Sequence, residues 1–180
     1  MKKFIQNLLL ICFFCGPILA NAQKADTKTF TGVILLQAGL PFGSAESEMK
    51  GSIGFDIRLA YHAGPGFATL TGGIAGFFGP SNSKAKSANG YYGGGIPFIK
   101  AGYKYFLDKR FFAMAEAGLS EYFLSDEVSG RTRNVRGTGL VVSPSAGVQF
   151  GKLELGLGYE LFSVAGGNIS NVSFRLGISF

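Results

Sequence analysis

The end of the sequence, from Ile169 to Phe180, alternates strictly between apolar and polar residues. The apolar set is Val172, Phe174, Leu176, Ile178 and Phe180, and the residues between them are Ser173, Arg175, Gly177 and Ser179. Because successive side chains of a β-strand point to opposite faces, this pattern predicts a strand with one apolar and one polar face. Such a strand needs a sheet whose two faces meet different surroundings, which excludes most helical folds.

The same alternation recurs along the chain and predicts an all-β fold with eight strands. The expected strands are Phe30–Phe42, Ile53–His62, Phe67–Phe78, Tyr92–Phe106, Arg110–Phe123, Gly139–Phe150, Leu153–Phe162 and Ile169–Phe180. Their connections are alternately long and short until a medium link before the last strand. An even number of strands, each near the roughly 9–11 residues of a tilted membrane strand, predicts an antiparallel up-and-down barrel.

Composition marks two of the short connections as tight turns. Ala63–Gly66 reads Ala-Gly-Pro-Gly, and the pair Gly151–Lys152 has its glycine first, as a type II′ hairpin requires. A two-residue loop there would pair Phe150 with Leu153 and Gln149 with Glu154. Apolar residues would then lie opposite apolar residues and polar residues opposite polar ones.

The turn Leu107–Lys109 is expected to have three residues. That length would place Lys100 directly opposite Glu116, a favourable cross-strand pair.

The long connections are expected to be external loops. The last of them, residues 125–138, holds a basic cluster made of Arg131, Arg133 and Arg136. These arginines could contact lipopolysaccharide phosphates or an acidic partner, since guanidinium groups bind such oxygens well. The alternative is an ordinary solvated loop.

The amino-terminal segment, residues 1–22, has the pattern of a secretory signal peptide. It begins with Lys2 and Lys3, continues with an apolar run and ends in small residues, which predicts cleavage after Ala22. Residues 23–29 would then be a short periplasmic lead and residues 30–180 the barrel domain.

Loss of this segment would remove both cysteines, Cys12 and Cys15, and two positive charges from a chain with a net charge of +6. The mature protein would therefore lack disulfides and thiolate metal sites, and its charge is too mild and dispersed to indicate nucleic-acid binding.

The composition of the polar face decides which face meets the membrane. A soluble, lipocalin-like barrel would have its apolar residues inside, whereas a membrane barrel has them outside. The polar face carries four cations and four anions: Asp56, Arg58, Lys100, Lys104, Glu116, Glu154, Glu160 and Arg175. Eight strands enclose a space that side chains can fill, so balanced charges could pair there in a lumen ion-pair network.

Aromatic residues support the same orientation. Five of them lie on the apolar face near the short-turn ends of the strands, where an aromatic girdle belongs. They are Tyr61, Tyr105, Phe111, Phe150 and Phe180.

A final aromatic residue behind alternating apolar positions resembles the signal by which outer-membrane barrels are recognised for assembly. Phe174, Leu176, Ile178 and Phe180 carry this resemblance. The chain is similar to the small eight-stranded outer-membrane β-barrel family of Gram-negative bacteria. The resemblance implies an outer-membrane location, contact with lipid and lipopolysaccharide, recognition by the barrel-assembly machinery through the last strand, and no aqueous pore. It does not imply one activity, because members serve as anchors, adhesins, stabilisers and occasionally lipid-modifying enzymes.

Catalytic chemistry has little support in the sequence. His62 is the only histidine and falls beside a short turn, at the end opposite to the rim where an outer-membrane hydrolase would place its triad. No catalytic, cofactor or metal site is predicted. The expectation is a non-enzymatic outer-membrane barrel with a structural, adhesion or surface-interaction role and an unknown external partner. The alternatives are a lipid-modifying enzyme and a narrow channel.

Overall fold

A computed structural model describes residues 30–42, 49–78, 95–128, 131–164 and 167–180. For residues 123–128 and 131–135 only the backbone is described. The predicted signal peptide and periplasmic lead lie outside the described residues.

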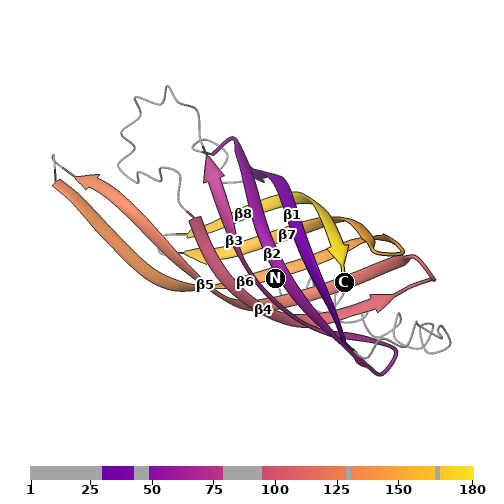
Figure 1. Ribbon diagram of the computed structural model, residues 1–180. Coiled ribbons are helices and arrows are strands. Elements are labelled where there is room, and N and C mark those ends of the chain that lie inside the picture. The colour runs from indigo at the N-terminus through magenta and orange to yellow at the C-terminus, as the bar shows by residue number, and fades with distance from the viewer. Residues whose placement is uncertain (1–29, 43–48, 79–94, 129–130, 165–166) are drawn as a thin grey trace, which may run out of the picture.

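Eight antiparallel strands form a closed barrel in which each strand pairs with the next and β8 pairs with β1 (Figure 1). The strands are β1 (Phe30–Phe42), β2 (Gly51–Ala63), β3 (Gly66–Phe78), β4 (Gly95–Phe106), β5 (Phe111–Val128), β6 (Arg131–Phe150), β7 (Leu153–Val164) and β8 (Gly167–Ser179). The predicted fold class is therefore confirmed. Among the described residues no helix is long and apolar enough to cross a membrane.

The barrel closes where the last strand meets the first. Ile34 lies opposite Ile178, and the backbones of Gly32 and Phe180 exchange hydrogen bonds of 3.2 and 2.9 Å. In the described part of the barrel wall, closure leaves no strand at a free sheet edge, which is the condition for a β-structure to enter a bilayer.

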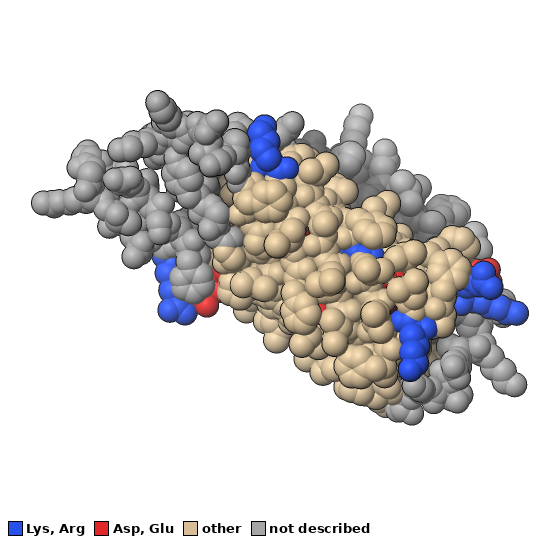
Figure 2. Space-filling view, turned by 45° about the horizontal axis from the view of Figure 1, so that its top comes forward, with Lys and Arg blue, Asp and Glu red and all other residues tan. Residues whose placement is uncertain are grey.

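The apolar residues of the strands face outward. Leu40, Ile53 and Leu157 have 67%, 63% and 62% of their surface exposed, whereas polar residues of the same strands as Ile53 and Leu157, namely Ser52 and Glu154, are buried. The surface seen in Figure 2 is mostly tan across its middle, with only small blue and red patches between the tan side chains, and the prominent lysines and arginines lie toward the two ends. An apolar belt of this kind is stable against lipid and unstable against water, which excludes the soluble lipocalin-like alternative.

The predicted aromatic girdle follows this outward face at the short-turn end. Tyr61, Phe111, Phe150 and Phe180 are exposed, and Tyr105 is half-buried. Phe30 extends the girdle, because it lies directly opposite Tyr61 in the register of β1 and β2.

Two of the predicted tight turns are present, and each has a glycine in the left-handed region. Gly64 and Gly151 have positive φ angles of 63° and 59°, the region that glycine adopts without strain. Across the second turn Phe150 pairs with Leu153 and Gln149 with Glu154, as predicted.

The third turn is longer than predicted, and the expected pairing of Lys100 with Glu116 is wrong. Phe106 pairs with Phe112, so five residues separate the partners, and Lys100 lies opposite Gly118. The backbone N–H groups of Leu107 and Asp108 bond to the carbonyl of Phe111, which folds the extra residues into the turn.

A second correction concerns residues 125–138, which were expected to form an external loop. Instead, β5 and β6 continue as a paired hairpin to Val128 and Arg131 and project beyond the other strands (Figure 1). Arg131, Arg133 and Arg136 therefore lie on β6 rather than on a loop. The alternation used to find strands depends on lipid at one face, and beyond the membrane neither face needs to be apolar.

Candidate functional site: the barrel lumen

All eight charged residues predicted for the polar face have buried side chains inside the barrel. Their exposed fractions are 5% or less, and they come from β2, β4, β5, β7 and β8. Charged side chains are almost never fully buried without partners, so their contacts decide what the interior can do.

The first group of contacts lies toward the short turns and is centred on Glu154 of β7. One of its carboxylate oxygens accepts a hydrogen bond from Arg58 Nη1 at 2.7 Å, and the other accepts one from Lys104 Nζ at 2.6 Å. Lys104 also donates to Gln149 at 2.9 Å. Arg58 and Lys104 come from β2 and β4, so these bonds cross the lumen.

The second group is centred on Glu160, further along β7. Its Oε1 lies 3.0 Å from Lys100 Nζ and 3.0 Å from Arg175 Nη2. Both cations also donate to the hydroxyl of Ser143, at 3.5 and 2.8 Å. These contacts connect β7, β4 and β8 across the barrel, and the Ser143 hydroxyl adds β6 to them.

Glu116 of β5 lies between the two groups. Its Oε1 accepts hydrogen bonds from Thr71 at 2.6 Å and Thr69 at 3.1 Å. The same carboxylate lies 3.7 Å from Arg58 Nε and 3.9 Å from Lys100 Nζ. It therefore joins the two groups electrostatically, across the lumen rather than through the direct cross-strand pairing expected from the sequence.

Asp56 is held differently from the other three carboxylates. It has no ion-pair partner among the described residues, and its Oδ1 accepts a hydrogen bond of 3.2 Å from the amide of Gln37. Gln37 in turn accepts a bond of 3.3 Å from Ser173. This polar chain ties β1, β2 and β8 together at the closing seam.

An apolar layer covers the network on the side of the projecting hairpin. Phe162 has its ring centroid 5.9 Å from that of Phe77 and 6.1 Å from that of Phe98. All three rings are buried, and Lys100 Nζ lies 4.2 Å from the Phe98 centroid. The ring and the ammonium group attract each other at this distance.

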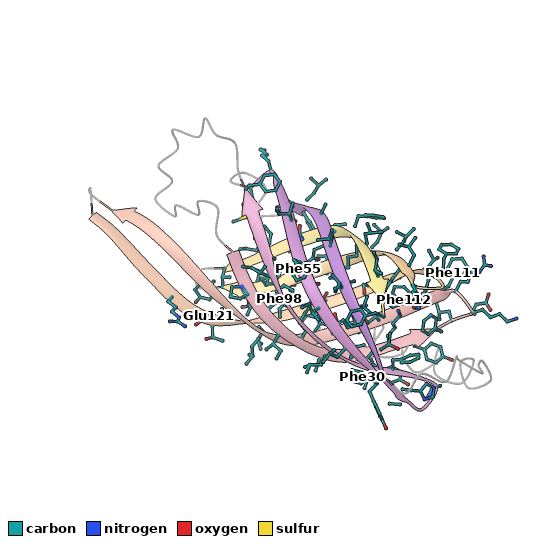
Figure 3. All side chains as sticks on the ribbon, in the orientation of Figure 1. Phe30, Phe55, Phe98, Phe111, Phe112 and Glu121 are labelled. Atoms are coloured by element: carbon teal, nitrogen blue, oxygen red, sulfur yellow. The ribbon has the colours of Figure 1, made fainter. Side chains whose placement is uncertain are left out.

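A second apolar layer lies on the side of the short turns. Phe106 stacks edge-on against Phe67 and Phe112, with centroids 6.0 and 6.1 Å apart. Lys104 Nζ lies 4.1 Å from the Phe112 centroid and 4.9 Å from that of Phe106. The ion-pair network thus lies between two aromatic layers inside the barrel, to which Phe98 and Phe112, labelled in Figure 3, belong.

Neither aromatic layer was predicted from the sequence. Phe98 and Phe162 stand two residues from Lys100 and Glu160, on the same face of their strands, and Phe112 lies four residues from Glu116 on the same face of β5. The sequence feature that could have predicted these layers is the presence of apolar residues on the polar face near the ends of the strands.

The remaining candidates lie away from the network. His62 is exposed at the short-turn end, with its ring 5.2 Å from Phe67. At the base of the hairpin Arg136 pairs with the half-exposed Glu121 through Nε at 2.6 Å (Figure 3). Among the described residues, no three histidine, cysteine or acidic side chains are grouped to hold a metal ion.

Solved structures share this architecture. The crystal structure of Ail, the attachment invasion locus protein of Yersinia pestis, has a TM-score of 0.65 at 10% identity and covers 86% of this chain and 100% of its own. A second structure of Ail, in complex with the heparin analogue sucrose octasulfate, has a TM-score of 0.58 at 12% identity, covering 84% and 98%. The N-terminal β-barrel domain of Pseudomonas aeruginosa OprF has a TM-score of 0.60 at 11% identity, covering 83% and 97%.

The chain has the fold of the small outer-membrane β-barrels. No protein-family model matches the sequence, and no curated protein matches it either. Identities this low establish the fold alone, and the outward apolar belt establishes the environment, because a closed antiparallel barrel with this exterior is an outer-membrane structure. The predicted location in the outer membrane is confirmed.

Proposed function

We propose that this protein is a non-enzymatic integral outer-membrane barrel whose lumen is closed by its own side chains. The observation that carries the proposal is the chain of cross-barrel ion pairs from Lys104 and Glu154 through Arg58 and Glu116 to Lys100. Side chains bonded to one another across the lumen occupy the space that a solute would need. The aromatic layers on both sides deny water a continuous polar path.

The projecting hairpin of β5 and β6 is the part of the described chain that would meet the surroundings of the cell. We infer a structural, adhesion or surface-interaction role for it. Arg131, Arg133 and Arg136 give β6 a run of cations suited to lipopolysaccharide phosphates or an acidic partner. The fold-level similarity to Ail supports this inference, since that protein has been solved with the anionic heparin analogue.

Assembly of the barrel is assigned to its closing strand. Phe174, Leu176 and Ile178 expose their side chains along β8, and Phe180 continues the row. This row is the surface that we propose the barrel-assembly machinery recognises before β8 pairs with β1.

Catalysis has no comparable support. The single histidine of the sequence, His62, contacts Phe67 at the rim opposite to the hairpin. The buried carboxylates Glu116, Glu154 and Glu160 are already bonded to cations, which accounts for them without a reaction.

Single-channel recording in planar bilayers tests the closed lumen. The wild-type protein is expected to give no steady conductance. A matched variant with Lys100, Glu160 and Phe162 all changed to alanine should conduct if it retains the heat-modifiable gel migration of a folded barrel. Steady wild-type conductance would establish a narrow channel instead. A change in lipid A mass spectra on expression of the protein would establish a lipid-modifying enzyme.

A further inference from the structure

The rim formed by the short turns carries an exposed group of cations on two neighbouring turns. Lys109 and Arg110 lie in the turn between β4 and β5, and Lys152 lies in the turn between β6 and β7. The backbone N–H of Gln149 bonds to the carbonyl of Arg110 at 2.8 Å, which fixes the two turns beside each other. The three cations therefore belong to one patch, here named the turn patch.

Arg110 connects this patch to the lipid-facing wall. Its guanidinium carbon lies 5.4 Å from the ring centroid of Phe150, and that ring is 46% exposed on the outward face. Aromatic residues of the girdle sit at the level of the lipid headgroups. The guanidinium group therefore lies at the level of the lipid headgroups.

The charges of the turn patch are not neutralised by the described protein. Lys109, Arg110 and Lys152 make no ion pair among the described residues. Asp108 is the only carboxylate within the two turns, so the patch keeps an excess of two positive charges. At the other end of the barrel wall, Arg136 is paired with Glu121.

We propose that the turn patch binds anionic phospholipid headgroups in the leaflet that faces the short turns. Arg110 donates to the lipid phosphate, with its orientation fixed by the Phe150 ring. Lys109 and Lys152 attract the net negative charge of the lipid and so distinguish phosphatidylglycerol from phosphatidylcholine. A Lys or Arg near an anionic surface contributes about 1 kcal/mol, which corresponds to a roughly fivefold preference. This inference needs the membrane-spanning fold but not a closed lumen.

Reconstitution into nanodiscs containing equal amounts of phosphatidylglycerol and phosphatidylcholine tests the proposal. Native mass spectrometry of the ejected protein would measure which lipid stays bound. We expect phosphatidylglycerol to be enriched at least about fivefold for the wild type. The enrichment should disappear in the triple variant Lys109→Gln, Arg110→Gln, Lys152→Gln and fall severalfold in Arg110→Gln alone.

The matched control is the double variant Lys109→Arg, Lys152→Arg, which keeps every charge of the turn patch. It should retain the wild-type enrichment, and heat-modifiable migration would verify that each variant is folded. Equal enrichment in this control and in the triple glutamine variant, or none in the wild type, would overturn the proposal. Single-channel recordings on the same samples test the closed lumen independently, so that failure of the lipid-binding proposal can be distinguished from failure of the proposed function.

Discussion

Lys100 of β4 lies directly opposite Gly118 of β5, and this pairing determines where the lysine can reach. A side chain at position 118 would meet the backbone of Ile99 and Lys100 at less than van der Waals distance. With only hydrogen there, β4 and β5 approach closely and the Lys100 ammonium group extends across the lumen to Glu160.

Gly118→Ala should therefore destabilise the barrel, because its methyl group meets rigid backbone rather than a movable side chain. Overpacking typically costs about 1–3 kcal/mol, and we expect the upper part of that range. Urea titration in detergent, followed by heat-modifiable migration, would measure the free energy of unfolding. Gly72→Ala is the control, because the nearest atom to its methyl group would be a backbone oxygen 4.0 Å away. Equal midpoints for the two variants would show that the close approach at Gly118 is unimportant.

Glu116→Ala is expected to cost about 3–5 kcal/mol, the range for breaking one side of a buried ion pair. Its removal leaves Arg58 and Lys100 with one fewer counter-charge and the hydroxyls of Thr69 and Thr71 without their acceptor. Glu121→Ala, five residues further along β5, removes a half-exposed carboxylate and should cost no more than about 1 kcal/mol. The same urea titration would compare the two variants. Similar losses in the free energy of unfolding would show that burial of the carboxylate does not determine its contribution to stability.

Leu157→Arg tests the outward face of β7. Leu157 is 62% exposed at the middle of the strand, where an arginine facing lipid costs about 2–4 kcal/mol. Leu107→Arg places the same side chain in a turn beyond the membrane, where the expected cost is about 0–1 kcal/mol. Refolding into liposomes with urea titration would measure both. A turn variant as unstable as the Leu157 variant would contradict the membrane position assigned to these residues.

Alternation predicted the strands, and the number of strands, the connection lengths and the charges of the polar face then predicted the membrane barrel. Each strand of the wall has one face in lipid, so residues such as Ile53 and Phe55 had to be apolar while Asp56 and Arg58 on the other face did not. The two-residue loop Gly151–Lys152 was predictable because a single glycine with positive φ fixes its geometry.

The projecting hairpin and the choice of ion-pair partners could not be predicted from alternation, for physical reasons. The hairpin beyond Ser120 projects past the other strands, so lipid enforces no pattern on residues 121–128 and 131–138. The choice of ion-pair partners depends on distances across the lumen, which a register error of two residues changes. Lys100 was therefore assigned to Glu116 as a cross-strand neighbour, although its shortest ion pair is with Glu160.

The central claim is that lipid contacts one face of the strands and that the other face is enclosed. Because the sequence has no tryptophan, single Phe→Trp variants give a fluorescence signal without background. Phe55 and Phe111 are 42% and 56% exposed on the outer wall, whereas Phe98 and Phe112 are 6% and 2% exposed in the lumen (Figure 3). Brominated lipid is expected to quench tryptophan at positions 55 and 111 strongly and at positions 98 and 112 weakly. The reverse order, or equal quenching at all four positions, would contradict the account.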